Sequence, residues 1–197
     1  MAAALVLLGA GIGTNDAAHA QARVVAFGDS YVHPSAAGWR EGQRPWLASL
    51  GEPVRNFGHA GDGVASTLKR VRRTAGTTFE VVVLEVGIND VRRSGTDPAR
   101  LARFRADYEQ VLQRLSSALR VVVVPPLPVR GWGKRGSEAA LKEHRDVVLE
   151  LAALHANVRI AEPLWQPDTM LLPDGLHPDA TGRAAIAAAV HAALNVS

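Results

Sequence analysis

Short apolar runs alternate along the chain with segments whose apolar residues recur every three or four positions. The runs are rich in Val, and such a run bounded by Gly, Pro or polar residues predicts a β-strand. One of them, FEVVVLEV, is long and mostly apolar, which is typical of a strand covered by helices on both faces. The predicted strands cover residues 23–27, 53–57, 79–86, 119–126 and 157–162.

The segments between these runs have a helical pattern. Asp97 is a predicted N-cap with Pro98 in the first helical position, and apolar residues recur with helical period from Leu101 to Leu115. The other predicted helices cover residues 45–50, 64–73, 137–155 and 179–194. The alternation of strands and helices predicts an α/β fold, with a parallel sheet between helices, in one domain over residues 21–197.

Residues 1–20 differ in composition from the rest of the chain. The stretch MAAALVLLGAGIG is apolar but too short to span a bilayer, and AAHA offers an Ala-x-Ala cleavage pattern that ends at Ala20. Unlike a typical signal peptide, the segment has no Lys or Arg before Arg23. We expect a signal peptide and a secreted or periplasmic protein without stable membrane insertion. The alternative is a disordered, Ala-rich N-terminus on a cytoplasmic protein.

Composition and charge exclude several kinds of site. The 197 residues include no Cys, which excludes disulfides, thiolate metal ligands and a cysteine nucleophile. The formal net charge is +3, and Arg residues alternate with acidic ones, as in DPARLARFRADYEQ. This pattern indicates solvated helix faces for most of the Arg residues, so we expect no nucleic-acid partner.

Polar, Gly-rich blocks follow the first three predicted strands. They are GDS at residues 28–30, GHAGDG at 58–63 and GIND at 87–90. The carboxyl ends of parallel strands meet at one edge of a sheet, and binding sites form there. We therefore expect the three blocks to border one pocket.

Serine-dependent acyl transfer needs a nucleophile, a base, an acid that orients the base, and donors for the oxyanion. Ser30 is the candidate nucleophile, and the block DGLHP near the C-terminus offers His177 as base and Asp174 as orienting acid. The candidate oxyanion donors are the N–H groups of Ser30 and Gly61 and the side-chain amide of Asn89. Each of these residue types is also common in turns, so residue type alone leaves a structural role open.

The four blocks FGDSY, NFGHAG, GIND and DGLHP together resemble the ordered signature blocks of the SGNH/GDSL hydrolase family. The resemblance runs from about residue 23 to the C-terminal helix. Within that family, the chain is most similar to the small, single-domain esterases and thioesterases. It implies a flavodoxin-like, three-layer α/β/α fold with a five-stranded, mostly parallel sheet. It also implies hydrolysis of small-molecule esters or thioesters with neither a metal nor a cofactor.

The resemblance assigns the same roles as the chemistry does: Ser30 as nucleophile, Asp174 and His177 as its partners, and Gly61 and Asn89 as oxyanion donors. A carbohydrate O-acetyl esterase is an alternative with the same machinery, and a non-catalytic glycan- or lipid-binding module is another.

Several further residues in or near these blocks have other expected roles. Tyr31 stands where the commonest family motif has Leu, so packing or the shape of the acyl pocket is expected to differ there. Asp29 and Asp90 are expected to brace loops through backbone N–H groups. A surface position is expected for His144 and His155, and His59 either lines the pocket or has no role there.

Overall fold

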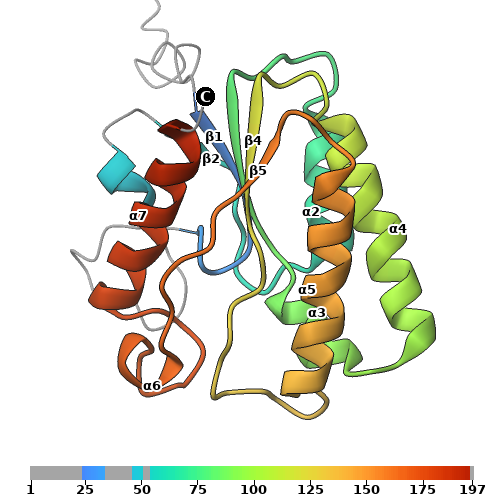
Figure 1. Cartoon of the computed structure of the whole chain (residues 1–197). Coiled ribbons are helices and arrows are strands. Elements are labelled where there is room, and N and C mark those ends of the chain that lie inside the picture. Colours follow the sequence, from blue (N-terminus) through green and yellow to red (C-terminus); the bar gives the residue numbers. More distant parts are fainter. Residues whose placement is uncertain (1–23, 34–45, 51–53, 196–197) are drawn as a thin grey trace, which may run out of the picture.

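The computed structural model describes residues 24–33, 46–50 and 54–195 (Figure 1). The predicted signal peptide and Pro45, the expected first residue of a helix, lie outside the described residues. In the described part of the chain, no helix combines the length and the apolar character that crossing a bilayer requires.

Five short strands form a single sheet in the described residues. They are β1 (Val24–Gly28), β2 (Val54–Asn56), β3 (Val81–Glu85), β4 (Arg120–Val124) and β5 (Val158–Ile160). The strand order is β2-β1-β3-β4-β5, and every neighbouring pair is parallel. The predicted five strands and the parallel sheet are confirmed, and the order is that of flavodoxin-like folds.

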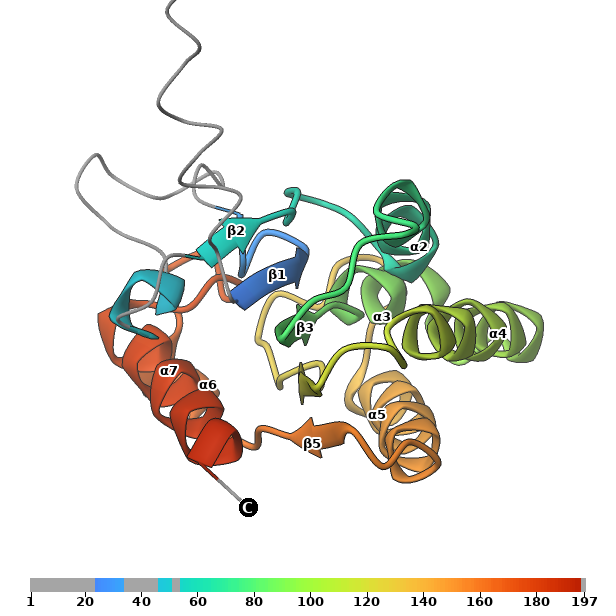
Figure 2. The ribbon, with the colours of Figure 1, turned by 90° about the horizontal axis from the view of Figure 1, so that it is seen from above.

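Helices cover both faces of the sheet (Figures 1 and 2). One face packs against α2 (Val64–Arg73), α4 (Pro98–Arg114) and α5 (Glu138–Ala153), with α3 (Ile88–Ser94) at its end. The other face packs against α7 (Ala180–Asn195) and the 3₁₀ helix η1 (Trp46–Leu50), and α6 (Pro167–Met170) contacts α7.

Alternation along β1 explains why two cores form. Val25 and Phe27 point into the core under α2 and α4, whereas Val24 and Ala26 point into the core under α7. The strand must therefore be apolar at every position, and all five of its residues are buried.

The helix α4 begins as predicted. Asp97 caps it, because its side chain accepts hydrogen bonds from the backbone N–H groups of Ala99 and Arg100. The helix ends at Arg114, one residue before the last position of the apolar stripe, and a turn leads from there into β4.

The block GIND opens the short helix α3, which starts after Gly87 at φ 134° and is capped by Gly95. One local prediction was wrong. His144, expected on the surface, is fully buried on the inner face of α5. Its ring lies 4.7 Å from that of Phe104, and its Nδ1–H donates to the carbonyl of Ala140 at 2.8 Å. The ring is thus a core side chain with one polar atom satisfied by its own helix.

Candidate active site

Strand order places three of the predicted blocks side by side. Because β1 lies between β2 and β3, the residues that follow these three strands meet at one edge of the sheet. The direction in which strands are added to the sheet also reverses here, since β2 lies on one side of β1 and β3 on the other. Ligand sites of open parallel sheets form at such a point.

Ser30 stands in the first turn after β1. The turn is fixed by Asp29, whose N–H donates to the carbonyl of Glu85 at 3.2 Å and whose Oδ1 accepts from Tyr31 N–H at 3.0 Å. Ser30 is 5% exposed, and its own N–H has no acceptor among the described residues. A hydroxyl and a free N–H are thus presented at the same point of the edge.

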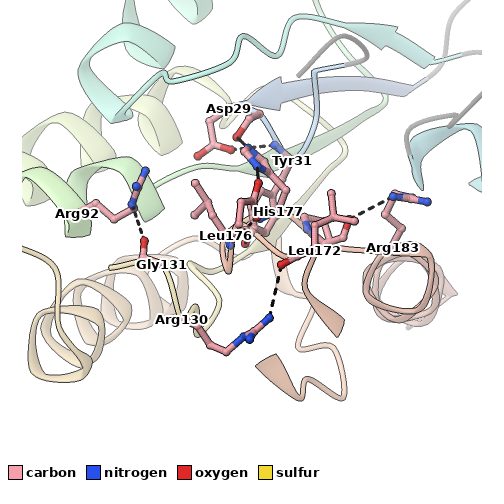
Figure 3. Close-up of polar contacts among 12 residues, drawn as sticks. Asp29, Tyr31, Arg92, Arg130, Gly131, Leu172, Leu176, His177 and Arg183 are labelled. Carbon is pink, nitrogen blue, oxygen red and sulfur yellow. Dashed lines mark hydrogen bonds and ion pairs between the residues drawn. The ribbon is translucent and has the colours of Figure 1, made fainter. Parts of the chain in front are cut away.

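The structure brings the distant DGLHP block against this turn (Figure 3). His177 Nε2 lies 3.1 Å from Ser30 Oγ, and His177 Nδ1 lies 2.6 Å from Asp174 Oδ2. The other carboxylate oxygen of Asp174 accepts from the N–H groups of Leu176 and His177, at 2.9 Å and 3.0 Å. The three candidate side chains therefore form one continuous hydrogen-bonded row.

These contacts determine the charge of Asp174. Its partial burial alone would raise its pKa, but the His177 ring and the two backbone N–H groups donate to the charged form and outweigh the burial. The pKa is held below its ordinary value, so Asp174 is ionised at neutral pH and accepts the Nδ1 proton of His177. This leaves Nε2 as the ring atom that faces Ser30.

The loop that carries His177 is held by other loops. Its Gly175 carbonyl accepts from the N–H groups of Arg130 and Gly131, both at 2.8 Å. Gly175 has φ +66°, and a Cβ at Gly131 would lie 2.7 Å from the Asp174 carbonyl, so both positions require glycine. These contacts tie the loop to the segment that follows β4.

The two remaining oxyanion candidates lie on the neighbouring blocks. Gly61, at φ +80°, has no acceptor for its N–H among the described residues, and its carbonyl accepts from Arg93 at 2.7 Å. Asn89 Nδ2 donates to Asp29 Oδ2 at 3.2 Å and to the Asp62 carbonyl at 3.0 Å. Both amide hydrogens of Asn89 thus have protein partners, and a substrate oxygen would have to replace or share one of them.

A family model for the GDSL-like lipase/acylhydrolase family matches residues 26–185. The chain belongs to this family. Membership makes the protein a carboxylic ester hydrolase, as the sequence predicted. No curated protein matches the chain significantly.

Solved structures resemble this acylhydrolase over most of its length. Axe2, an acetylxylan esterase from Geobacillus stearothermophilus, has a TM-score of 0.68 at 17% identity over 90% of this chain and 95% of its own. TesA has a TM-score of 0.68 at 20% identity, over 87% of this chain and 97% of its own. LAE5, an α/β hydrolase from the metagenome of Lake Arreo in Spain, has a TM-score of 0.68 at 18% identity, over 88% and 94%. At these identities the likeness shows that the fold is shared.

The GDSL-like acylhydrolase also contains a buried carboxyl pair that the sequence pattern did not reveal. Glu85, the last residue of β3, is fully buried, and its carboxyl group lies within hydrogen-bonding reach of the Asp29 carboxyl group. Burial first, and then the neighbouring Asp29, raise the pKa of Glu85 well above its ordinary value. Burial also raises the pKa of Asp29. We therefore expect Glu85 to keep its proton at neutral pH, so that at most one charge lies under the serine turn.

Both predicted braces are confirmed. Asp29 binds the N–H of Tyr31, and Asp90 Oδ2 accepts from the N–H of Val64 at 3.0 Å, at the start of α2. A Cβ at Gly63 would lie 2.6 Å from Asp90 Oδ1, so the close approach of that carboxylate requires glycine. Asp90 thereby joins the second block to the third.

Of the two roles expected for Tyr31, packing or shaping the acyl pocket, the structure shows packing. Its side chain is 1% exposed, so it is a packing residue. Its hydroxyl donates to the Leu176 carbonyl at 2.5 Å, and its ring centre is 6.3 Å from that of His177. The Tyr therefore links the serine turn directly to the histidine loop, which a Leu could not do. His59 is exposed and lies 5.7 Å, ring to ring, from His33.

Among the described residues, no group of three or more His, Cys, Asp or Glu side chains is arranged to hold a metal ion.

Proposed function

We propose that the protein cleaves esters through an acyl-enzyme formed on Ser30, with His177 as the base and Asp174 as its orienting partner. The observation that carries the proposal is the row of contacts from Ser30 Oγ to His177 Nε2, 3.1 Å, and from His177 Nδ1 to Asp174 Oδ2, 2.6 Å. A hydroxyl, an imidazole and a carboxylate in this order are the parts that a serine nucleophile needs.

The reaction follows from these contacts. His177 Nε2 takes the Ser30 proton as Oγ bonds to the acyl carbon, and the resulting imidazolium is stabilised by the Asp174 carboxylate. The imidazolium gives its proton to the leaving group, at the oxygen of an alcohol or the sulfur of a thiol. Water then attacks the acyl carbon and loses a proton to His177, which returns that proton to Ser30 Oγ as the carboxylic acid leaves.

Three donors are the candidates for stabilising the negative charge that develops on the acyl oxygen. The N–H groups of Ser30 and Gly61 have no protein acceptor in the described part of the chain, so both can donate to an oxyanion. Asn89 adds its amide if the substrate oxygen takes the place of Asp29 or of the Asp62 carbonyl. The binding of substrate is then coupled to a change in this hydrogen-bond network.

Structures of catalytic mutants of the acetylxylan esterase support the assignment. In these mutants a serine, an aspartate or a histidine is replaced by alanine, and that aspartate and histidine are three positions apart. Asp174 and His177 have the same spacing.

The acetylxylan and acetyl-xylooligosaccharide esterases among the similar structures also favour a narrower candidate, a carbohydrate O-acetyl esterase. Under this alternative the acyl group is acetate and the leaving group is a sugar hydroxyl. Comparing turnover of acetylated xylooligosaccharides with that of p-nitrophenyl esters of increasing chain length separates it from a broader esterase or thioesterase.

The decisive experiment replaces the nucleophile. We expect Ser30→Ala to lower kcat for p-nitrophenyl acetate by about 10³-fold or more, and Asp174→Asn by a similar order, because the wrong tautomer then faces the serine. Far-ultraviolet circular dichroism checks that both variants are folded, and Ser117→Ala, at an exposed position, is the matched control. Turnover by Ser30→Ala near the wild-type rate, or failure of a fluorophosphonate to label Ser30, would refute the assignment.

We also infer that residues 1–20 are a signal peptide cleaved after Ala20, as AAHA suggests. Expression of the full chain in a bacterium with a periplasm, followed by N-terminal sequencing of the periplasmic protein, tests this. A protein retained in the cytoplasm with an intact N-terminus would contradict it.

A further inference from the structure

A cavity of about 500 Å³ borders the site at Asn89. It lies between α3, the start of α4 and the loop that follows β4. Its lining contains five cationic side chains and no acidic one; the cations are Arg92, Arg93, Arg100, Lys134 and Arg135. We refer to it as the basic cavity.

The fold assembles these cations from three separate segments. Arg92 and Arg93 belong to α3 and Arg100 to α4, whereas Lys134 and Arg135 come from the loop before α5. The loop is pressed against the turn between α3 and α4, because a Cβ at Gly95 would lie 2.7 Å from the Arg135 carbonyl. Packing of the backbone therefore holds like charges together around one space.

Three of the arginines each donate a hydrogen bond to a backbone carbonyl and still have further N–H donors. Arg92 Nε donates to the Gly131 carbonyl at 2.9 Å (Figure 3), and Arg100 donates to the Arg93 carbonyl at 2.9 Å. Arg93 donates to the Gly61 carbonyl at 2.7 Å. A guanidinium has five N–H donors, so each of them retains several.

The remaining two cations, Lys134 and Arg135, have neither an acceptor nor an acidic partner in the described ranges. Two acidic residues near the basic cavity offset part of its charge. Asp97 Oδ2 forms an ion pair with Arg100 Nε at 3.7 Å, and Asp90, whose pKa burial raises to about 6, is still mostly ionised at neutral pH. Five cations line the cavity, so positive charge remains in excess.

We propose that the basic cavity binds an anionic group, a carboxylate or a phosphate, that the ester substrate carries away from its scissile bond. The inference rests on the proposed function, because it places the ester at Ser30 and the anion beyond Asn89. Arginine forks match the oxygens of carboxylates and phosphates, and several of them around one cavity give both affinity and orientation.

Shared residues connect the basic cavity to the ester site. Asn89 lines the cavity and also contacts Asp29, the neighbour of Ser30. Arg93 holds the carbonyl of Gly61, whose N–H is a candidate oxyanion donor. An anion bound here is therefore positioned next to the oxyanion side of the site, where it orients the rest of the same molecule.

The test uses three phenyl acetates whose phenol leaving groups differ only in the para substituent. One carries a propanoate chain para to the ester, the second the matching primary amide and the third a propyl phosphate. We expect wild-type kcat/KM to be higher for the acetate that carries the propanoate or the propyl phosphate than for the one that carries the neutral amide. Whichever charged substrate has the higher kcat/KM identifies the anion that the cavity binds. In the double variant Lys134→Gln/Arg135→Gln, we expect that preference to fall about tenfold while the neutral ester changes less than about twofold.

A matched variant separates the cavity from the overall charge of the protein. Lys69→Gln/Arg73→Gln removes the same two charges from the exposed face of α2, away from the basic cavity. It should leave the preference unchanged at fixed ionic strength. The proposal is overturned if both double variants lose the preference equally, or if wild type prefers neither anionic ester.

The binding step is measured apart from chemistry. Calorimetric titration of folded Ser30→Ala with the phenol products should show tighter binding of the charged product than of the amide, and equal binding of the two would count against the cavity. The neutral ester tests the proposed function separately: if Ser30→Ala still hydrolyses it at the wild-type rate, the nucleophile is wrong whatever the cavity binds.

Discussion

The two halves of the candidate site are held in different ways. Ser30 follows a central strand, lies over buried side chains and is 5% exposed. Asp174 lies in a loop, and its side chain is 43% exposed. The sheet therefore positions the proposed nucleophile, whereas contacts among loops position the proposed base. Damage to the first half should spread through the fold, and damage to the second should remain local.

Two glycine substitutions give the largest contrast. In Gly28→Ala the new Cβ would lie 2.1 Å from the Glu85 carbonyl oxygen, so β1 must shift against β3. We expect a loss of about 2–3 kcal/mol of stability and a fall in Tm of about 5–10 °C. In Gly175→Ala the Cβ would lie 3.0 Å from Gly131 N, at φ +66°. Here we expect about tenfold lower kcat and a fall in Tm of only about 2–4 °C.

Gly76→Ala is the control for the second substitution. Gly76 also has positive φ, +83°, but nothing lies within 4 Å of its Cβ position. It should lower Tm slightly and leave kcat unchanged. Thermal melts and turnover of p-nitrophenyl acetate give both quantities, and the contrast fails if Gly175→Ala lowers Tm as much as Gly28→Ala does.

A smaller effect is expected from the link between the halves. Tyr31→Phe keeps the buried ring but removes the donor to the Leu176 carbonyl. We expect Tm to fall by about 2–4 °C, and kcat by about threefold to tenfold, because His177 is less well held.

Tyr108→Phe is the matched control for the link. The Tyr108 hydroxyl is buried without a partner in the described part of the chain, so its removal should leave kcat unchanged and Tm equal or higher. Equal kcat in Tyr31→Phe and Tyr108→Phe would show that the Tyr31 hydroxyl does not position the base.

The smallest effect concerns the buried carboxyl pair. Burial and Asp29 raise the pKa of Glu85 above 4.5, so its protonated form stabilises the fold at acidic pH. That contribution is lost as the pH rises toward the folded-state pKa. Glu85→Gln stays neutral, and its Tm relative to wild type should therefore increase between about pH 5 and about pH 9. A difference that is independent of pH would contradict a protonated Glu85.

The main features of the fold could be predicted from sequence because burial on both faces leaves few alternatives for the strands. The Val-rich runs are apolar throughout, and Asp97 with Pro98 is a strong helix start. The blocks were recognisable because glycines and polar residues follow strands abruptly. Their adjacency followed from the rule that sites lie at the carboxyl ends of parallel strands.

Other features depend on contacts that the periodicity of apolar residues did not indicate. The helix α3 is short and mostly polar, and its ends depend on the backbone of Gly87 and Gly95. The buried His144 shares the inner face of α5 with Leu141 and Val148, so the spacing contained a signal that the polarity of histidine obscured.

The basic cavity was missed for a related reason. Its cations are separated by up to about forty residues in sequence, and each alone is typical of a solvated helix face or loop. Only the packing of three segments shows that they share one space.

The contact between Ser30 and His177 joins residues 147 positions apart. Closing so long a loop is entropically costly until the intervening strands have paired, so the contact forms late in folding. During synthesis on the ribosome, the first strand waits for nearly the whole domain before its serine meets the imidazole. If Ser30 and His177 act as proposed, hydrolytic activity is a readout of completed folding, and partly folded chains that expose Ser30 should not hydrolyse esters.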